Sequence, residues 1–375
     1  MLAISSARSA LYFNFFVIGF CPEGRRQDHH AGWTAGWTAG WTARLLFLGI
    51  DIGGTKRVVV VGDHTGRPLE QIRKPMEDSG DWRTDLGCLV EDGRRLLSKW
   101  QVETGETLAR VGVSVPGPAD TSRGLLLNPP NLPTWHDAPI GAALHAAFGV
   151  EIRVENDANA AALAEHEFGA GRGVRNMVYL TMSTGIGGGV IADGELLRGA
   201  FGAAGEVGHI PIESPGAPCA CGLTGCLEAY VGGNAWRTRL RAVTPETSSV
   251  FERAGGDRAA IRPEHLVAAA QAGDPFACRE FGRWLDYLVR GLVPVIMMVE
   301  PERIVLGTIA TAAGEALCFG PLRERMADHL WPLQCERLSI VPAALGDELP
   351  ARAGLAVALA GVPMLASALS ASRAN

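Results

Sequence analysis

Three cysteines fall within eight positions of this sequence, in the stretch PCACGLTGCLE at residues 218–228. They are Cys219, Cys221 and Cys226, and His209 lies upstream in the stretch GEVGHI. Structural zinc sites take four nitrogen or sulfur ligands in a tetrahedron, and these four side chains supply such a set. The competing interpretation is three buried free thiols. We predict zinc, because this loop of Pro, Gly and Cys has no apolar period to order it and a metal would do so.

Two glycine-rich turns have the residue types that bind phosphate. In DIGGTK, Asp51 follows an apolar run, Gly53 and Gly54 allow backbone N–H groups to approach an anion, and Thr55 and Lys56 add a hydroxyl and a charge. A hairpin turn also explains this stretch in isolation. The stretch MSTGIGGGV at residues 182–190 repeats the pattern, and two such turns favour phosphate binding over simple hairpins.

A third motif, VENDANAAALAE, places Asp157 where a predicted strand leads into a predicted helix. By itself this position indicates a helix N-cap, since Asp is among the best capping residues. Beside two phosphate-binding turns, the same carboxylate can accept the proton of a hydroxyl group that attacks a γ-phosphate.

The elements that must position these residues alternate between strands and helices along the chain, which predicts an α/β fold in two lobes. A β-hairpin or meander is predicted over residues 45–69, and a hairpin over 176–197. The remaining predicted strands are 109–117, 151–157, 302–307 and 337–345, and the predicted helices are 81–102, 158–171, 234–243, 264–298, 314–329 and 350–370.

The composition and net charge argue against nucleic-acid binding and for a cytoplasmic protein. The chain has 375 residues, 47% of them hydrophobic, and a formal net charge of -6, which offers no basic field for a nucleic acid. The other five cysteines are scattered, as expected of reduced thiols in a cytoplasmic protein. Residues 1–44 contain an apolar run after Arg8, too short to span a bilayer but laid out like a signal peptide, and a repeat of Trp-Thr-Ala-Gly. We expect a low-complexity, disordered extension, or a start codon assigned too early, rather than a secretion signal, and no membrane partner.

Together these motifs resemble the ROK family of repressors and sugar kinases from about Leu46 to the end of the chain. CACGLTGCLE fits every fixed position of the family signature C-x-C-G-x-x-G-C-x-E, and GEVGH, ENDANAAALAE, DIGGTK and STGIGGG also fit. The resemblance implies an actin-like ATPase (ribonuclease H-like) fold, with two lobes around a cleft, and a homodimer. The expected lobes are residues 45–153, completed by a helix at about 350–370, and residues 154–349.

The resemblance also implies a role for each motif residue. Asp157 would be the catalytic base, and Zn²⁺ would be structural, held by His209, Cys219, Cys221 and Cys226. ATP would bind with Mg²⁺. The implied sugar contacts are Gly117, Asn131, Asn156, Glu206, His209 and Glu228, and the implied nucleotide and phosphate contacts are Asp51, Gly53, Gly54, Thr55, Lys56, Thr184 and Gly185. One stretch departs from the family: GTIAT at residues 307–311 stands where a Gly-Gly-Gly turn is usual.

The function implied is an ATP-dependent hexokinase that phosphorylates glucose to glucose 6-phosphate. The alternatives are the same chemistry on N-acetylmannosamine, N-acetylglucosamine or fructose, or a sugar-responsive repressor. We expect a kinase rather than a repressor, because the residues before LGIDIGGTK carry little basic charge and no pattern of a DNA-reading domain.

Overall fold

The computed structural model describes residues 45–76 and 79–362. The expectations for residues 1–44 and for the end of the last predicted helix lie outside these ranges. Contacts between residues divide the chain into Met1–Thr42 and Ala43–Asn375, and the elements described here all belong to the second unit. Within the described ranges, no helix is both long enough and apolar enough to cross a bilayer.

The first sheet has five strands in the order β3-β2-β1-β4-β7. The predicted meander is confirmed, because the first three strands pair antiparallel, while β4 and β7 run parallel to β1. The strand bounds are β1 (Leu45–Ile52), β2 (Lys56–Gly62), β3 (Pro68–Pro75), β4 (Thr107–Val115) and β7 (Glu151–Asn156). All of β7 belongs to this sheet, so a lobe boundary after residue 153 would fall inside a strand.

The helices of this half cover one face of the first sheet. Helix α1 (Trp82–Thr104) begins after Asp81, whose carboxylate caps it, and ends at Gly105 in the left-handed conformation (φ 70°). Alternate residues of β1, such as Leu48 and Ile50, pack in one core with this helix. Sequence reasoning missed helix α2 (Ile140–Phe148) and the short hairpin of β5 (Ala119–Asp120) and β6 (Leu125–Leu126).

The second sheet also has five strands, in the order β10-β9-β8-β11-β12. The predicted hairpin at its centre is confirmed, since β8 and β9 pair antiparallel, and β11 is parallel to both β8 and β12. The bounds are β8 (Met177–Met182), β9 (Ile186–Ala192), β10 (Glu195–Leu196), β11 (Arg303–Leu306) and β12 (Ser339–Pro342).

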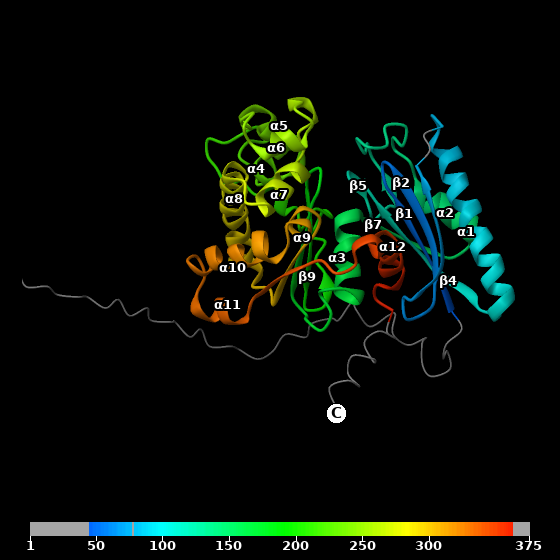
Figure 1. Ribbon diagram of the computed structural model, residues 1–375. Coiled ribbons are helices and arrows are strands. Elements are labelled where there is room, and N and C mark those ends of the chain that lie inside the picture. The colour runs from blue at the N-terminus through cyan, green and yellow to red at the C-terminus, as the bar shows by residue number, and fades with distance from the viewer. Residues whose placement is uncertain (1–44, 77–78, 363–375) are drawn as a thin grey trace, which may run out of the picture. The chain divides into compact units, whose positions relative to one another are not determined.

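Helices α3 (Asp157–Phe168) and α12 (Leu349–Leu359) pack against each other, and they also contact the two sheets (Figure 1). The odd-numbered residues Met177 and Tyr179 of β8 face them, whereas Val178 and Leu180 face the opposite core, as the two-residue period of a strand requires. Glycine permits the close approach of α12 to the first sheet: a Cβ on Gly112 would lie 2.2 Å from the Ala358 nitrogen.

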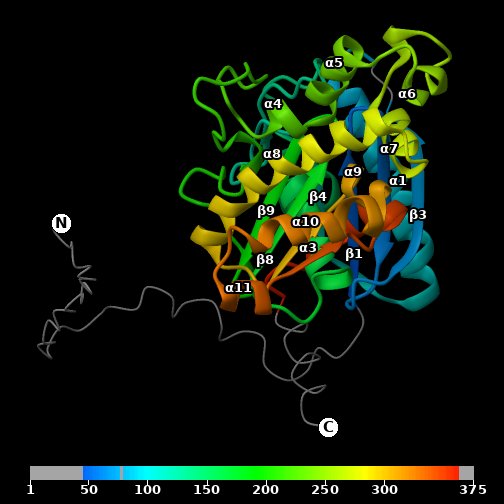
Figure 2. The ribbon, with the colours of Figure 1, turned by 60° about the vertical axis from the view of Figure 1, so that its left-hand side comes forward.

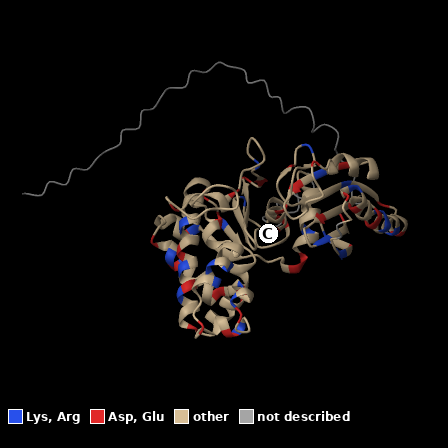
Figure 3. Ribbon diagram, turned by 90° about the horizontal axis from the view of Figure 1, so that it is seen from above, with Lys and Arg blue, Asp and Glu red and all other residues tan. Residues whose placement is uncertain are grey.

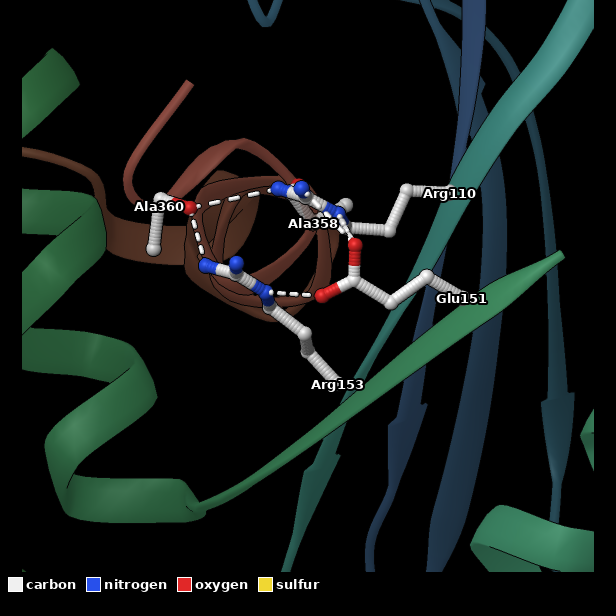
Figure 4. A network of polar contacts seen from close by, with 5 residues as sticks. All are labelled: Arg110, Glu151, Arg153, Ala358 and Ala360. Carbon is white, nitrogen blue, oxygen red and sulfur yellow. Dashed lines mark hydrogen bonds and ion pairs between the residues drawn. The ribbon is translucent and has the colours of Figure 1, made fainter. Parts of the chain in front are cut away.

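Two arginines of the first sheet hold the carboxyl end of α12 (Figure 4). Arg110 donates to the Ala358 carbonyl at 2.9 Å and the Ala360 carbonyl at 3.2 Å, and Arg153 donates to the same Ala360 carbonyl. Glu151 bridges the two arginines at 2.9 and 2.8 Å. Cations at a helix C-terminus satisfy carbonyls that have no partner within the helix, so β4 and β7 fix where α12 ends.

The other face of the second sheet is covered by helices of the second half, with α8 and α10 in front in Figure 2. In this core Trp236 stacks on Trp284, Phe281 meets Trp236 edge-on and Trp284 at a tilt, and Trp284 donates to the Val231 carbonyl at 2.9 Å. The bounds are α4 (Glu228–Val231), α5 (Gly233–Val243), α6 (Ser249–Arg253), α7 (Pro263–Gln271), α8 (Pro275–Val299), α9 (Ile309–Gly314), α10 (Gly320–Ala327) and α11 (Pro332–Arg337).

Some helix predictions were wrong in extent. The stretch 264–298 holds two helices, α7 and α8, because Gly273 takes a positive φ of 83° and Asp274 caps the second helix. The helix predicted at 314–329 consists of a π turn at Glu315–Phe319 followed by α10, and Gly314, with a positive φ of 76°, separates it from α9. Helix α12 ends at Leu359, and the predicted helical residues beyond 362 lie outside the described ranges. Basic and acidic residues are mixed along the helices seen in Figure 3.

Candidate functional site

In the turn between β1 and β2, two backbone N–H groups have no hydrogen-bond acceptor among the described residues. The Gly53 N–H donates to the Lys56 carbonyl at 3.0 Å, which closes the turn. Among the described residues, nothing accepts a hydrogen bond from the N–H groups of Gly54 and Thr55. A Cβ on Gly54 would lie 2.7 Å from the Asn131 Cβ, so this turn adjoins the loop that carries a predicted sugar contact.

The turn between β8 and β9 repeats this arrangement. The Ser183 N–H donates to the Gly185 carbonyl at 3.0 Å. The N-terminus of α5 holds the turn from outside, where Gly233 and Asn234 donate to the carbonyls of Ser183 and Thr184, each at 2.9 Å. Within the part of the chain that the structure covers, the N–H groups of Thr184 and Gly185 have no acceptor. Each turn therefore presents two adjacent free N–H groups, the arrangement that binds phosphate oxygens.

Asp157 lies where β7 leads into α3, but it is not the N-cap of that helix. Asn156 is the N-cap, because its side-chain oxygen accepts from the N–H groups of Ala158 at 2.9 Å and Asn159 at 3.4 Å. Asp157 is instead the first residue of the helix, and its Oδ1 accepts from the Ala158 N–H at 2.8 Å. Since another residue caps the helix, Asp157 is not needed for that role.

Three carboxylates influence one another at this corner. The pKa of Asp157 is raised mainly by loss of hydration, although the side chain retains accessible surface, and the charge of Glu206 raises it further. Burial likewise raises the pKa of Asp51 to about 6, against the lowering effect of a 2.7 Å hydrogen bond from Ser114, and the charge of Asp157 adds to the rise. Asp51 and Glu206 therefore both lie within electrostatic reach of Asp157.

The other predicted sugar residues fall on loops around this corner. A Cβ on Gly117 would lie 3.3 Å from the Asn156 side-chain nitrogen, which places the loop after β4 beside the N-cap. Glu206 is exposed and immediately precedes the 3-10 turn Val207–His209, and its carbonyl accepts from the His209 N–H at 3.0 Å. The GEVGH stretch thus connects the carboxylate corner to the cysteine loop.

Glu228 contacts both the cysteine loop and the second glycine-rich turn. Its Oε2 accepts from the Ile186 N–H at 2.7 Å, and the Cys219 thiol donates to its Oε1 at 3.7 Å. A Cβ on Gly185 would lie 2.3 Å from Oε2, so a side chain at this position would displace the Glu228 carboxylate. Glu228 therefore positions the turn between β8 and β9, in addition to the sugar contact predicted for it.

The four predicted metal ligands lie together. The ligand atoms of His209, Cys219, Cys221 and Cys226 are all within 4.8 Å of one another. The Cys221 and Cys226 sulfurs are 3.8 Å apart, and His209 Nδ1 is 3.7 Å from the Cys219 sulfur. Ligands arranged tetrahedrally around zinc at its usual bond lengths stand about 3.8 Å apart for two sulfurs and about 3.6 Å for sulfur and nitrogen. These side chains therefore match the ligand set of a closed zinc site.

Sequence reasoning missed an ion pair at the same corner, between the buried carboxylate of Glu155 and the half-exposed Arg198. Glu155 is 2% exposed and accepts from Arg198 Nε at 2.8 Å, from the Asn159 side chain at 3.0 Å and from the Asn156 N–H at 3.1 Å. The Arg198 carbonyl in turn accepts from the Ala204 N–H at 3.1 Å. This pair ties the loop before Glu206 to the helix that carries Asp157. In the sequence, the only signal was the acidic residue Glu155 in VENDAN, and nothing there indicates that Arg198 is its partner.

Comparisons with known proteins agree with this architecture. Residues 47–360 match the ROK family. A glucokinase of Thermotoga maritima is 36% identical over 313 residues, which cover 81% of this chain and 94% of that protein. The crystal structure of a ROK hexokinase from Thermus thermophilus has a TM-score of 0.71 and 33% identity, over 86% of this chain and 99% of that one.

A ROK family glucokinase from Streptomyces griseus, solved in complex with glucose and AMPPNP, has a TM-score of 0.66 and 29% identity, over 84% of this chain and 99% of that one. The matched region includes both sheets, both glycine-rich turns and the cysteine loop. The chain therefore belongs to the ROK family and has the actin-like ATPase fold predicted from its motifs.

Proposed function

We propose that this ROK-family sugar kinase transfers the γ-phosphoryl group of ATP to glucose and forms glucose 6-phosphate. The observation that carries the proposal is the position of Asp157, an accessible carboxylate with a raised pKa, between Asp51 on one sheet and the Glu206 loop beside the other. The glucokinase relatives support glucose as the acceptor.

Asp157 is suited to act as the general base. The raised pKa of Asp157 makes its carboxylate a stronger base than an ordinary aspartate, and the ionised form is the one that accepts the proton. The Ala158 N–H fixes its orientation. As the sugar oxygen bonds to the γ-phosphorus and the bond to the leaving phosphate oxygen breaks, the hydroxyl proton moves to the Asp157 carboxylate.

The two glycine-rich turns would hold the phosphates. The free N–H groups of Gly54, Thr55, Thr184 and Gly185 can donate to phosphate oxygens, and the Lys56 ammonium adds a positive charge. Asp51 suits Mg²⁺, because a divalent cation would relieve the repulsion between its carboxylate and that of Asp157. When bound, Mg²⁺ neutralises charge on the transferring phosphoryl group.

The sugar would be bound by residues on the loops around Asp157. Carboxylate and amide groups accept from and donate to sugar hydroxyls, and the sequence resemblance assigns this role to Gly117, Asn131, Asn156, Glu206, His209 and Glu228. Asn156 and Gly117 lie side by side, and the charge of Glu206 reaches Asp157, so these three are near the proposed base.

We further propose that His209, Cys219, Cys221 and Cys226 hold one structural Zn²⁺. Four protein ligands fill a tetrahedral site and leave no position for a catalytic water. The zinc would stabilise the loop that carries Glu228, which follows the ligand Cys226 by two residues and whose carboxylate holds the residue after the phosphate turn. Its proposed role is therefore to fix the position of the sugar-contact residues relative to the phosphate-binding turn.

A coupled assay of ADP release tests the substrate. The purified enzyme is given ATP, Mg²⁺ and, in separate reactions, glucose, fructose, mannose, N-acetylglucosamine or N-acetylmannosamine. We expect the highest kcat/KM with glucose. A higher value with an N-acetyl hexosamine or fructose would replace glucose as the substrate, and no ADP release with any sugar would overturn the kinase assignment.

The site chemistry fits the cytoplasm. ATP is the phosphoryl donor in the proposal, and no cysteine in the described ranges forms a disulfide, including the exposed Cys278 and Cys335. Thiols persist in a reducing compartment. We therefore place the enzyme in the cytoplasm.

A further inference from the structure

Thr308 stands in an unfavourable backbone conformation in the connection between β11 and α9. Its φ is 48° and its ψ is -107°, a region that side chains rarely occupy, and threonine is β-branched as well. This is the segment in which the sequence departs from the family by having GTIAT. A strained residue persists only where its surroundings hold it, and such residues cluster at functional sites.

The Thr308 hydroxyl holds both backbone groups of a single residue, Met182. It accepts from the Met182 N–H at 2.8 Å and donates to the Met182 carbonyl. The register between β11 and β8 ends at Leu306 and Leu180, and the Gly307 N–H then donates to the Leu180 carbonyl at 2.8 Å. The hydroxyl thus extends the attachment of β8 beyond the last paired strand residue, to the end of β8.

Met182 leads directly into the phosphate turn. It is the last residue of β8, and Ser183, Thr184 and Gly185 follow. The far side of this turn is held by the α5 N-terminus and by Glu228. Without Thr308, the strand end before the turn would lose its side-chain attachment to the β11–α9 connection.

We propose that Thr308 is a positioning residue for nucleotide binding, whose hydroxyl fixes Met182 and so holds the free N–H groups of Thr184 and Gly185 in the orientation that meets the phosphates. The inference rests on the proposed function for the identity of the ligand. Nucleotide affinity should therefore depend on the Thr308 hydroxyl. Sugar affinity should not, because it depends on the loops around Asp157.

Three variants separate the hydroxyl from the shape of the residue. Thr308→Val keeps the β-branched shape and removes both hydrogen bonds. Thr308→Ser keeps the hydroxyl. The matched control is Thr311→Val, because the Thr311 hydroxyl also bonds a backbone carbonyl of this connection, that of Leu306 at 2.9 Å, but does not reach β8.

Binding of AMPPNP with Mg²⁺ and binding of glucose are measured separately by calorimetry, alongside KM for ATP and for glucose. We expect Thr308→Val to weaken AMPPNP binding about tenfold and to raise KM for ATP similarly, with glucose affinity unchanged within about twofold. Thr308→Ser and Thr311→Val are expected to stay within about threefold of the wild type. Equal losses for nucleotide and sugar, or the same loss in Thr311→Val, would overturn the proposal.

Thr308→Gly provides a second test in case the valine variant does not fold, because glycine tolerates the positive φ. It also lacks the hydroxyl, so we expect weaker AMPPNP binding with a melting temperature close to that of the wild type. Wild-type nucleotide affinity in this variant would sink the inference. Calorimetry measures binding and does not require catalysis. If the wild-type protein binds AMPPNP but does not phosphorylate glucose, the proposed function is refuted, while the inference about Thr308 can still be tested.

Discussion

The Glu228 carboxylate accepts a hydrogen bond from the Ile186 N–H at 2.7 Å, across 42 positions of the sequence. The other oxygen of the same carboxylate meets the Cys219 thiol. A residue of the cysteine signature thus holds the first residue after the phosphate turn. The metal loop and the nucleotide site therefore share one side chain.

Glu228→Ala should weaken both substrates. Its loss leaves the Ile186 N–H without an acceptor and frees the turn, so we expect KM for ATP to rise about tenfold, in addition to the loss of a sugar contact. Glu228→Gln retains an oxygen that can accept this bond and should keep KM for ATP within about threefold. Steady-state kinetics with each substrate varied in turn checks this. An unchanged KM for ATP in Glu228→Ala would show that the hydrogen bond has no role in nucleotide binding.

Asp157→Asn should remove the base and preserve the shape. The amide oxygen can still accept from the Ala158 N–H, and Asn156 still caps the helix. We expect kcat to fall about 100-fold or more, with glucose affinity nearly retained. Asp193→Asn, the same change on an exposed turn, serves as the control. A variant that keeps half the wild-type kcat would exclude Asp157 as the base.

The raised pKa of Asp51 has a consequence for stability. A carboxyl group with a pKa of about 6 in the folded protein and its ordinary 3.8 when unfolded favours folding fully below about pH 4, and this contribution is lost as pH rises through 6. Asp51→Asn should therefore raise the unfolding free energy at pH 7 by about 1–3 kcal/mol, with little change near pH 4. Its activity should fall because the Mg²⁺ contact is lost. Urea unfolding at both pH values measures the difference, and equal stability of the two proteins at pH 7 would contradict the prediction.

The ionisation of Asp51 and Asp157 should also limit activity in acid. Both pKa values lie above the ordinary aspartate value, and both groups act as carboxylates in the proposed reaction. We expect kcat/KM for glucose to decline as pH falls through about 6, rather than through about 4. A pH–rate profile between pH 4.5 and 8 would reveal it, in buffers of constant ionic strength. Full activity at about pH 4.5 would mean that Asp51 does not titrate near pH 6, where its surroundings indicate.

The proposed zinc site predicts the metal content of the protein and the effect of losing one ligand on the KM of both substrates. Elemental analysis of the purified protein should find about one zinc per chain. Cys221→Ser should lose the metal and raise KM for glucose, and, because Glu228 reaches Ile186, KM for ATP as well. Cys278→Ser and Cys335→Ser, both exposed and outside the cluster, are the controls. Metal-free protein with wild-type kinetics would support the alternative that the cysteines are ordinary thiols.

Much of the fold and site could be predicted from local patterns. The β1–β3 meander, the β8–β9 hairpin and helix α1 follow from apolar runs, period and capping residues, which act over a few positions. Short elements such as α2 and α11 were missed, since brief apolar patterns do not distinguish a helix from a loop. The division of 264–298 into two helices depended on Gly273 taking a positive φ, which the surrounding helical pattern concealed.

The amino-acid sequence by itself determined the donor types and the two turns, because glycine spacing and cysteine spacing act through neighbouring residues. Only the tertiary structure decided which distant groups meet: Glu228 with Ile186, Glu155 with Arg198, and Thr308 with Met182. Hydrogen bonds form wherever packing brings a donor and an acceptor within about 3 Å, and no local pattern specifies such a pairing across 42 or 126 positions.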